Sequence, residues 1–144
     1  MIIKKIYRCM RVDDDGKPQE GGNSLGVRER DVELDPKDPS TIIKNDKGMS
    51  CATTVERLIA LFPTRVPERL GGKAKYARCP RETEEGVQGV WAVWEVDLAT
   101  LQSKEFKVII EDNGHVMITC DGVPYPLEDF EKHILGTKED WRMI

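Results

Sequence analysis

Arg8 is the first residue whose type and position suggest chemistry. Alternating apolar residues predict a strand over residues 3–12, and Arg8 falls on the more apolar face of that strand. A guanidinium group in such a place needs either a buried partner or a ligand. Two interpretations follow: Arg8 pairs with a buried carboxylate such as Glu95 or Asp97, or it contacts an anionic ligand.

Ser50 precedes the clearest helix signal in the sequence. Thr53 and Glu56, three residues apart, form a capping box, and apolar residues then recur at helical spacing up to Phe62. Free backbone N–H groups at a helix N-terminus favour anions. Ser50 is therefore expected either to face a ligand or to bond backbone groups ahead of the helix.

His115 follows Asn113-Gly114, a dipeptide typical of two-residue hairpin turns. Such a turn pairs Asp112 with His115 and Ile110 with Met117. The imidazole then shares a face with apolar side chains of both strands. We expect either a structural role for His115 or a site in which Asp112 and His115 act together.

The cysteines argue against a metal centre. They are widely spaced without a C-x-x-C pair, and the chain has two histidines, so we expect no metal site. Free cysteines in apolar segments pack as small hydrophobic residues. We interpret them as reduced packing residues; a Cys–His hydrolase using Cys51 or Cys120 with His115 is the weaker alternative. The four residues are Cys9, Cys51, Cys79 and Cys120.

Composition predicts one domain, spanning residues 1–144, without membrane contact. No apolar run approaches the roughly 18 residues of a membrane-spanning helix, and no segment looks like a cleaved signal peptide, so we expect a cytoplasmic protein. The net charge is −4, yet residues 57–81 hold seven basic residues and one acidic residue. That stretch either attracts phosphate-bearing ligands or is a solvated loop, and the overall acidity argues against nucleic-acid binding.

The remaining patterns predict an α+β fold with mostly antiparallel strands and two short helices. A second helix is expected from Pro126 to Gly136, and residues 13–47 are predicted to be loop-rich chain that borders a binding site. The Asp35-Pro36 and Asp38-Pro39 pairs mark that region as irregular. Further strands are expected at 25–28, 32–34, 87–96, 106–110 and 115–120.

Taken in order, these pieces resemble the bacterial type VI secretion toxin family with an ADP-ribosyltransferase-like fold. Each matching piece is short, and residues 55–90 match poorly. The matching pieces are Ile6-Tyr7-Arg8, Leu25-Gly26-Val27-Arg28, Gly48-Met49-Ser50, Glu95-Val96-Asp97-Leu98, Gly114-His115-Val116-Met117-Ile118 and a closing helix with Trp141.

The resemblance implies two small, mostly antiparallel sheets with short flanking helices and a cleft between the sheets that binds NAD as a substrate. It implies that Arg8 binds the pyrophosphate of NAD, with Arg28 as a further phosphate contact. Ser50 would face the nicotinamide ribose, and His115 would bond the ligand or orient the site. It also implies transfer of ADP-ribose to an unknown intracellular acceptor, an immunity protein as partner, and delivery into a target cell without a cleaved signal peptide.

One departure leaves the activity open. The class uses a late glutamate, often in a Glu-x-Glu pair, to stabilise the cation that forms as nicotinamide leaves. Here Glu82-Thr83-Glu84 comes before the central strand instead. The chain is therefore expected to transfer ADP-ribose weakly, to use another group, or to bind NAD without reaction. The alternatives are an RNA 2′-phosphotransferase-like enzyme and a non-catalytic protein-binding module on the same fold.

Overall fold

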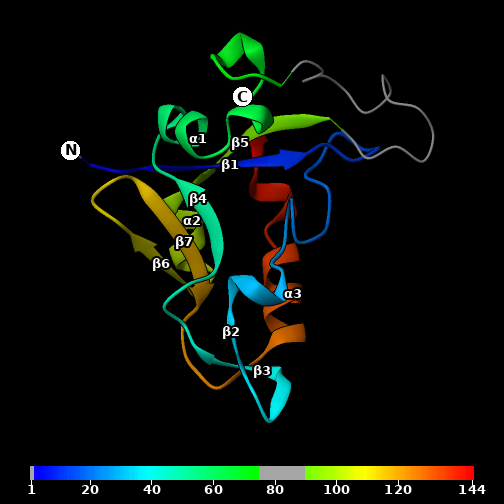
Figure 1. Cartoon of the computed structure of the whole chain (residues 1–144), viewed down its shortest axis with the longest axis vertical. Helices are drawn as coiled ribbons and strands as arrows, with labels where there is room; N and C mark the ends of the chain where they lie inside the picture. The colour runs from blue at the N-terminus through cyan, green and yellow to red at the C-terminus, as the bar shows by residue number, and fades with distance from the viewer. Residues whose placement is uncertain (1, 75–89) are drawn as a thin grey trace.

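The computed structural model describes residues 2–74 and 90–144, and these form an α+β fold with two antiparallel sheets (Figure 1). The larger sheet has the strand order β6-β7-β4-β1-β5-β9, and the smaller has the order β2-β3-β8. The larger sheet contains β1 (Lys5–Arg11), β4 (Met49–Ala52), β5 (Trp91–Asp97), β6 (Phe106–Ile110), β7 (His115–Cys120) and β9 (Arg142–Met143). The smaller contains β2 (Glu33–Asp35), β3 (Asp38–Lys44) and β8 (Tyr125–Pro126). The helices are α1 (Val55–Leu61), α2 (Leu98–Ser103) and α3 (Leu127–Leu135), with 3₁₀ turns at Glu29–Asp31, Pro63–Arg65, Glu68–Leu70 and Lys138–Asp140.

This arrangement confirms the predicted α+β class with antiparallel sheets and short helices, although α2 adds an α-helix to the two that the sequence predicts. No helix within residues 2–74 and 90–144 has the length and apolar character needed to cross a membrane.

β1 and β5 form the longest strand pair of the larger sheet. They pair over seven residues, from Lys5 opposite Asp97 to Arg11 opposite Trp91. Because successive side chains alternate between faces, this sheet has two separate apolar cores. The main core lies on the face that carries Ile6 and includes side chains from α3, and a smaller one lies on the opposite face beneath α1.

The main core confirms the predicted closing helix. Phe130 and Ile134 of α3 are fully buried, one turn apart on the same side of the helix. Pro126 precedes the first helical residue and Gly136 follows the last. Burial of one aromatic and one aliphatic side chain stabilises this contact by roughly 3–6 kcal/mol.

α1 begins one residue later than the capping-box pattern predicts. Thr54, not Thr53, is the N-cap, and its hydroxyl accepts a hydrogen bond from the Arg57 N–H at 3.1 Å. Thr53 is instead tied to the neighbouring hairpin, where its backbone N–H donates to the Gly114 carbonyl at 2.9 Å. That tertiary bond outweighs the local sequence preference.

Thr54→Ala is expected to destabilise the protein by about 1 kcal/mol, because it removes the side-chain acceptor for one orphan N–H of α1. In a chain of this size, that loss lowers the melting temperature by roughly 2–4 °C. Thr53→Ala is the matched control, since the Thr53 hydroxyl makes only a 3.5 Å contact with the Gly114 carbonyl. Equal melting shifts in the two variants would contradict the assignment of the cap.

The region from 13 to 47 is more regular than predicted. Residues 38–44 form β3, the middle strand of the smaller sheet, although Pro39 suggested irregular chain. Pro39 is tolerated because it lies near the start of the strand, where its missing N–H costs little. The expected strand at 25–28 is wrong, since that segment contributes only an isolated bridge between Glu20 and Leu25.

The β6–β7 hairpin differs from the predicted register by one residue. Ile110 pairs with Val116 rather than with Met117, and Glu111 lies opposite His115. The loop therefore has three residues, 112–114, and Gly114 takes a φ of 88° that favours glycine. A one-residue shift exchanges the two faces of a strand, so His115 does not share a face with Ile110.

Cys9, Cys51 and Cys120 are free and buried, which confirms their interpretation as packing residues. Burial raises the pKa of the Cys9 thiol to about 12 and that of Cys51 to about 11, so both are protonated at neutral pH. Cys79, Glu82 and Glu84 lie outside the described residues.

Candidate functional site

Ser50 lies inside β4 rather than at a helix N-terminus. β4 pairs with β7 so that Ser50 faces Met117 and Ala52 faces His115. Ser50 and His115 therefore lie diagonally across one strand pair, on the same face of the sheet. The two side chains meet in a hydrogen bond of 2.7 Å between the Ser50 Oγ and the His115 Nε2.

Gly48 allows β4 to approach β7 closely at this point. A Cβ atom at position 48 would collide with the backbone carbonyl of Ile118. The short approach holds the β4 backbone against β7 and fixes the distance across which Ser50 meets His115.

Glu111 completes a chain of three side chains. Its Oε1 lies 2.6 Å from the His115 Nδ1, and its backbone N–H donates to the His115 carbonyl at 2.9 Å. The carboxylate accepts a hydrogen bond from Nδ1–H, which leaves Nε2 of a neutral imidazole free to accept from the Ser50 hydroxyl. The imidazole is about one-quarter exposed and the carboxylate about half, so the chain opens to solvent at one end.

This order of atoms suits proton transfer from the Ser50 hydroxyl. The imidazole can take the hydroxyl proton, and the carboxylate stabilises the imidazolium that results. The arrangement brings together two predicted site residues, Ser50 and His115. The acidic partner of His115 is Glu111 and not, as the sequence suggested, its neighbour Asp112.

Arg8 is buried, with 8% of its surface exposed, but no carboxylate hydrogen-bonds its side chain among the described residues. Its Nε–H donates to the Ser24 carbonyl at 2.7 Å, and its Nη1 donates to the Ser50 carbonyl. Burial lowers the pKa of this guanidinium, although charge-assisted hydrogen bonds to carbonyls favour its charged form.

The contact with the Ser50 carbonyl has a structural reason. β1 and β4 share one register pair, Tyr7 with Ala52, so the two strands separate beyond it. Arg8 supplies a donor to a carbonyl at this point of separation. It thereby fixes the backbone of the residue whose hydroxyl bonds His115.

The expected pairing of Arg8 with Glu95 or Asp97 is wrong. Both carboxylates extend to the opposite side and bond surface cations. Lys5 lies 2.7 Å from Asp97, and Arg142 lies 3.1 Å from Asp97 and 3.5 Å from Glu95. The strand alternation places them there, because Arg8 faces Trp94 while Tyr7 faces Glu95.

Arg28 is half-buried and held by Asp31. Its Nε and Nη2 lie 3.2 and 3.1 Å from the two carboxylate oxygens, and the Arg28 backbone N–H also donates to Asp31. Burial opposes ionisation of Asp31, but these hydrogen bonds outweigh burial and lower its pKa.

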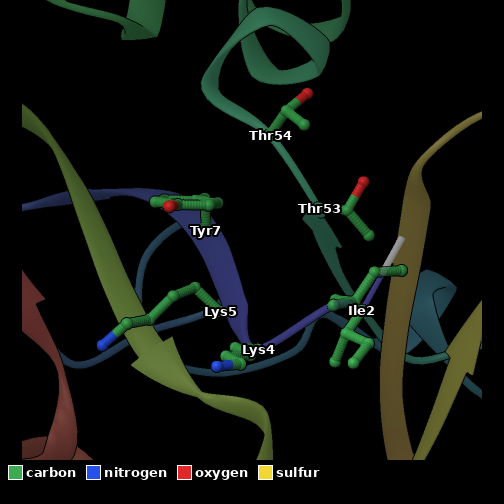
Figure 2. Close-up of a pocket in the computed structure, with 7 residues that line it drawn as sticks. Ile2, Lys4, Lys5, Tyr7, Thr53 and Thr54 are labelled. Carbon is green, nitrogen blue, oxygen red and sulfur yellow. The ribbon is translucent and has the colours of Figure 1, made fainter.

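A cavity of about 350 Å³ lies on the same face of the sheet as Ser50, beside the start of α1. Figure 2 shows Thr53 and Thr54 on the segment that leaves β4, with Tyr7 and Lys5 on β1 and Lys4 just before it. The pairing of His115 with Ala52, and of Ala52 with Tyr7, places this cavity two strands from the imidazole. The remaining lining residues are Ile2 and Ile3.

Cys51 and Cys120 do not join the site. They alternate onto the face opposite Ser50 and His115, and both are buried in the main core. Within residues 2–74 and 90–144, no three acidic, cysteine or histidine side chains are grouped closely enough to hold a metal ion.

Three comparisons with known proteins found no match: no family model, no curated protein and no solved structure resembles this chain at a significant level.

Proposed function

We propose that this protein is a group-transfer enzyme that binds NAD and transfers ADP-ribose, with Ser50, His115 and Glu111 at its reactive centre. One observation carries the proposal: two consecutive hydrogen bonds, of 2.7 and 2.6 Å, link the hydroxyl, the imidazole and the carboxylate. The substrate class comes from the resemblance to ADP-ribosyltransferase-like toxins, as do the toxin role and the immunity protein.

The proposed reaction breaks the bond between C1′ of the nicotinamide ribose and the nicotinamide nitrogen. Nicotinamide leaves as a neutral base, and an acceptor hydroxyl or amine, or water in simple hydrolysis, forms the new bond to C1′. The acceptor's proton passes to the Ser50 oxygen as the Ser50 hydroxyl proton passes to Nε2 of His115, and Glu111 stabilises the imidazolium. Glu111 directly follows β6, in the hairpin that leads into the late strand β7, so it supplies a carboxylate near a late strand where Glu82 and Glu84 do not.

The two arginines have different parts in this proposal. Arg28 is the phosphate contact, supported by its partial exposure beside Asp31. Arg8 is buried on the face of the sheet opposite the Ser50 hydroxyl, so its part is to hold the Ser50 backbone through the Ser50 carbonyl.

Incubation of the purified chain with NAD tests the proposal. Nicotinamide release is expected for the parent and only background release for Ser50→Ala, which removes the hydroxyl without burying a new polar group. Melting the parent with NAD at about 100 times the dissociation constant should show roughly 2.7 kcal/mol of stabilisation. Absence of both release and stabilisation would rule out NAD as the substrate.

A second function, ester or acyl hydrolysis, is supported by the atom order of the same three side chains. The Ser50 hydroxyl bonds Nε2 of His115, and Nδ1 bonds the Glu111 carboxylate. Serine hydrolases connect their nucleophile, their general base and the carboxylate that orients the base in the same order. A fluorophosphonate probe distinguishes this case, since it labels an activated serine and should spare Ser50→Ala. Labelling without nicotinamide release would favour hydrolysis, and neither signal would favour the non-catalytic binding module.

A further inference from the structure

An arginine-rich cluster lies on the same sheet face as Ser50, at the opposite end of β1 from the cavity. Arg11 and Trp91 face each other across β1 and β5, and the Arg11 guanidinium carbon stands 4.4 Å from the Trp91 ring centre. Arg65, from the turn after α1, approaches the same ring at 4.7 Å and the Phe62 ring at 4.9 Å. Two guanidinium groups thus converge on one indole.

The stacking fixes these two cations in place. A guanidinium over an aromatic ring keeps its N–H donors in the plane of the group, where they remain available at its edges. In residues 2–74 and 90–144, neither Arg11 nor Arg65 forms a salt bridge with a carboxylate. The cluster is preorganised, so it loses little side-chain entropy when it binds an anion.

Two further arginines add positive charge to this region. Burial lowers the pKa of the Arg65 guanidinium, and the neighbouring charges of Arg28 and Arg11 add to that lowering. Arg8 is also within reach of Arg65. Within the described residues, Asp31 is the carboxylate that lies near these arginines, and Arg28 already binds both of its oxygens. Repulsion between these like charges falls when an anion binds.

We propose that Arg11, Arg65 and Trp91 form a binding site for the phosphate or pyrophosphate group of a small-molecule ligand. Planar guanidinium groups match the oxygens of such groups, and two of them can share one tetrahedral anion. The site does not depend on NAD as the substrate. It sits on the face that carries the Ser50 hydroxyl, so it would hold the charged part of whatever ligand reaches that hydroxyl.

Calorimetric titration of the full chain with inorganic pyrophosphate, in parallel with ADP and NAD, tests this site. Saturable binding is expected, and Arg65→Gln and Arg11→Gln should each weaken it about tenfold through loss of a charge-assisted hydrogen bond. Arg30→Gln, which removes an exposed arginine outside the cluster, should leave the affinity unchanged. Trp91 gives an independent signal, because it is half-buried while Trp94 and Trp141 are buried.

The possible results distinguish failure of the anion site from failure of the proposed reaction. If pyrophosphate or ADP binds and binding requires Arg65, but no nicotinamide is released, the anion site is supported and the proposed reaction is ruled out. If both NAD turnover and pyrophosphate binding are indifferent to Arg65→Gln and Arg11→Gln, the site is overturned and the reaction stands. If either variant melts below the parent, Arg65→Lys retains the charge and should still bind pyrophosphate more tightly than Arg65→Gln. No binding to the parent, or equal weakening in Arg30→Gln, also overturns the site.

Discussion

His115→Ala is expected to lower the rate of nicotinamide release, or of fluorophosphonate labelling, by about 10²–10⁴-fold. The substitution removes the acceptor for the Ser50 proton, and it leaves Glu111 without the group that it orients. Glu111→Gln should have a smaller effect, because the imidazole remains and loses only its charged partner. Rates at a fixed pH, with the melting temperature of each variant, provide the measurement.

His133→Ala is the matched control for that experiment, since His133 is the other histidine in the chain. Its imidazole stacks on Phe106 at 3.9 Å and bonds the Lys104 carbonyl through Nε2, away from Ser50. We expect this variant to lose stability and keep its rate. Equal loss of rate in both histidine variants would show that folding, not proton transfer, limits the reaction.

Arg8→Ala is expected to destabilise the protein by about 2–4 kcal/mol, with or without NAD. It leaves the Ser24 and Ser50 carbonyls without their donor, at about 1–3 kcal/mol each, and removal of a buried charge offsets part of that cost. In a chain of this size the melting temperature should fall by at least roughly 4 °C. Urea unfolding of the parent and the variant measures the difference in free energy directly.

Lys5→Ala is the control for loss of a cation from the same strand. Lys5 pairs with Asp97 at the surface, so its removal should cost less than about 1 kcal/mol. If Arg8→Ala melts like the parent but no longer binds NAD, the main role of Arg8 is ligand binding. The hydrogen bonds to the two carbonyls would then contribute little to folding.

The elements with strong periodic signals could be predicted from the sequence. β1 and α3 each combine alternating or helical apolar spacing with clear ends, and both lie where expected. β3 could not be predicted, because one of its partners, β8, is distant in sequence and its Asp-Pro start suggests a turn. Tertiary pairing outweighed local preference there. The ADP-ribosyltransferase-like fold stays a prediction.

The site was predictable in part. Ser50 and His115 were singled out separately, and the pairing of β4 with β7 brings them together. Glu111 was missed because Asn113-Gly114 favours a two-residue turn, which assigns Asp112 to His115 instead. Arg8 was expected to pair with a carboxylate or to contact a ligand; the backbone carbonyls that it bonds belong to distant segments and cannot be inferred from side-chain spacing.

The hydrogen-bonded chain of Ser50, His115 and Glu111 depends on the three-residue length of the loop in the β6–β7 hairpin. With Gly114 in the left-handed conformation, the imidazole lies on the same face as Ser50. A loop shorter by one residue would shift the pairing register and move the side chains of one strand to the opposite face. The contact between Glu111 and His115 would then be lost, although every residue of the site would still be present. Natural variation in such a protein would be constrained here against insertions and deletions more strictly than against many substitutions. A lineage could therefore lose the hydrogen-bonded chain, or acquire it, through one codon gained or lost in the turn.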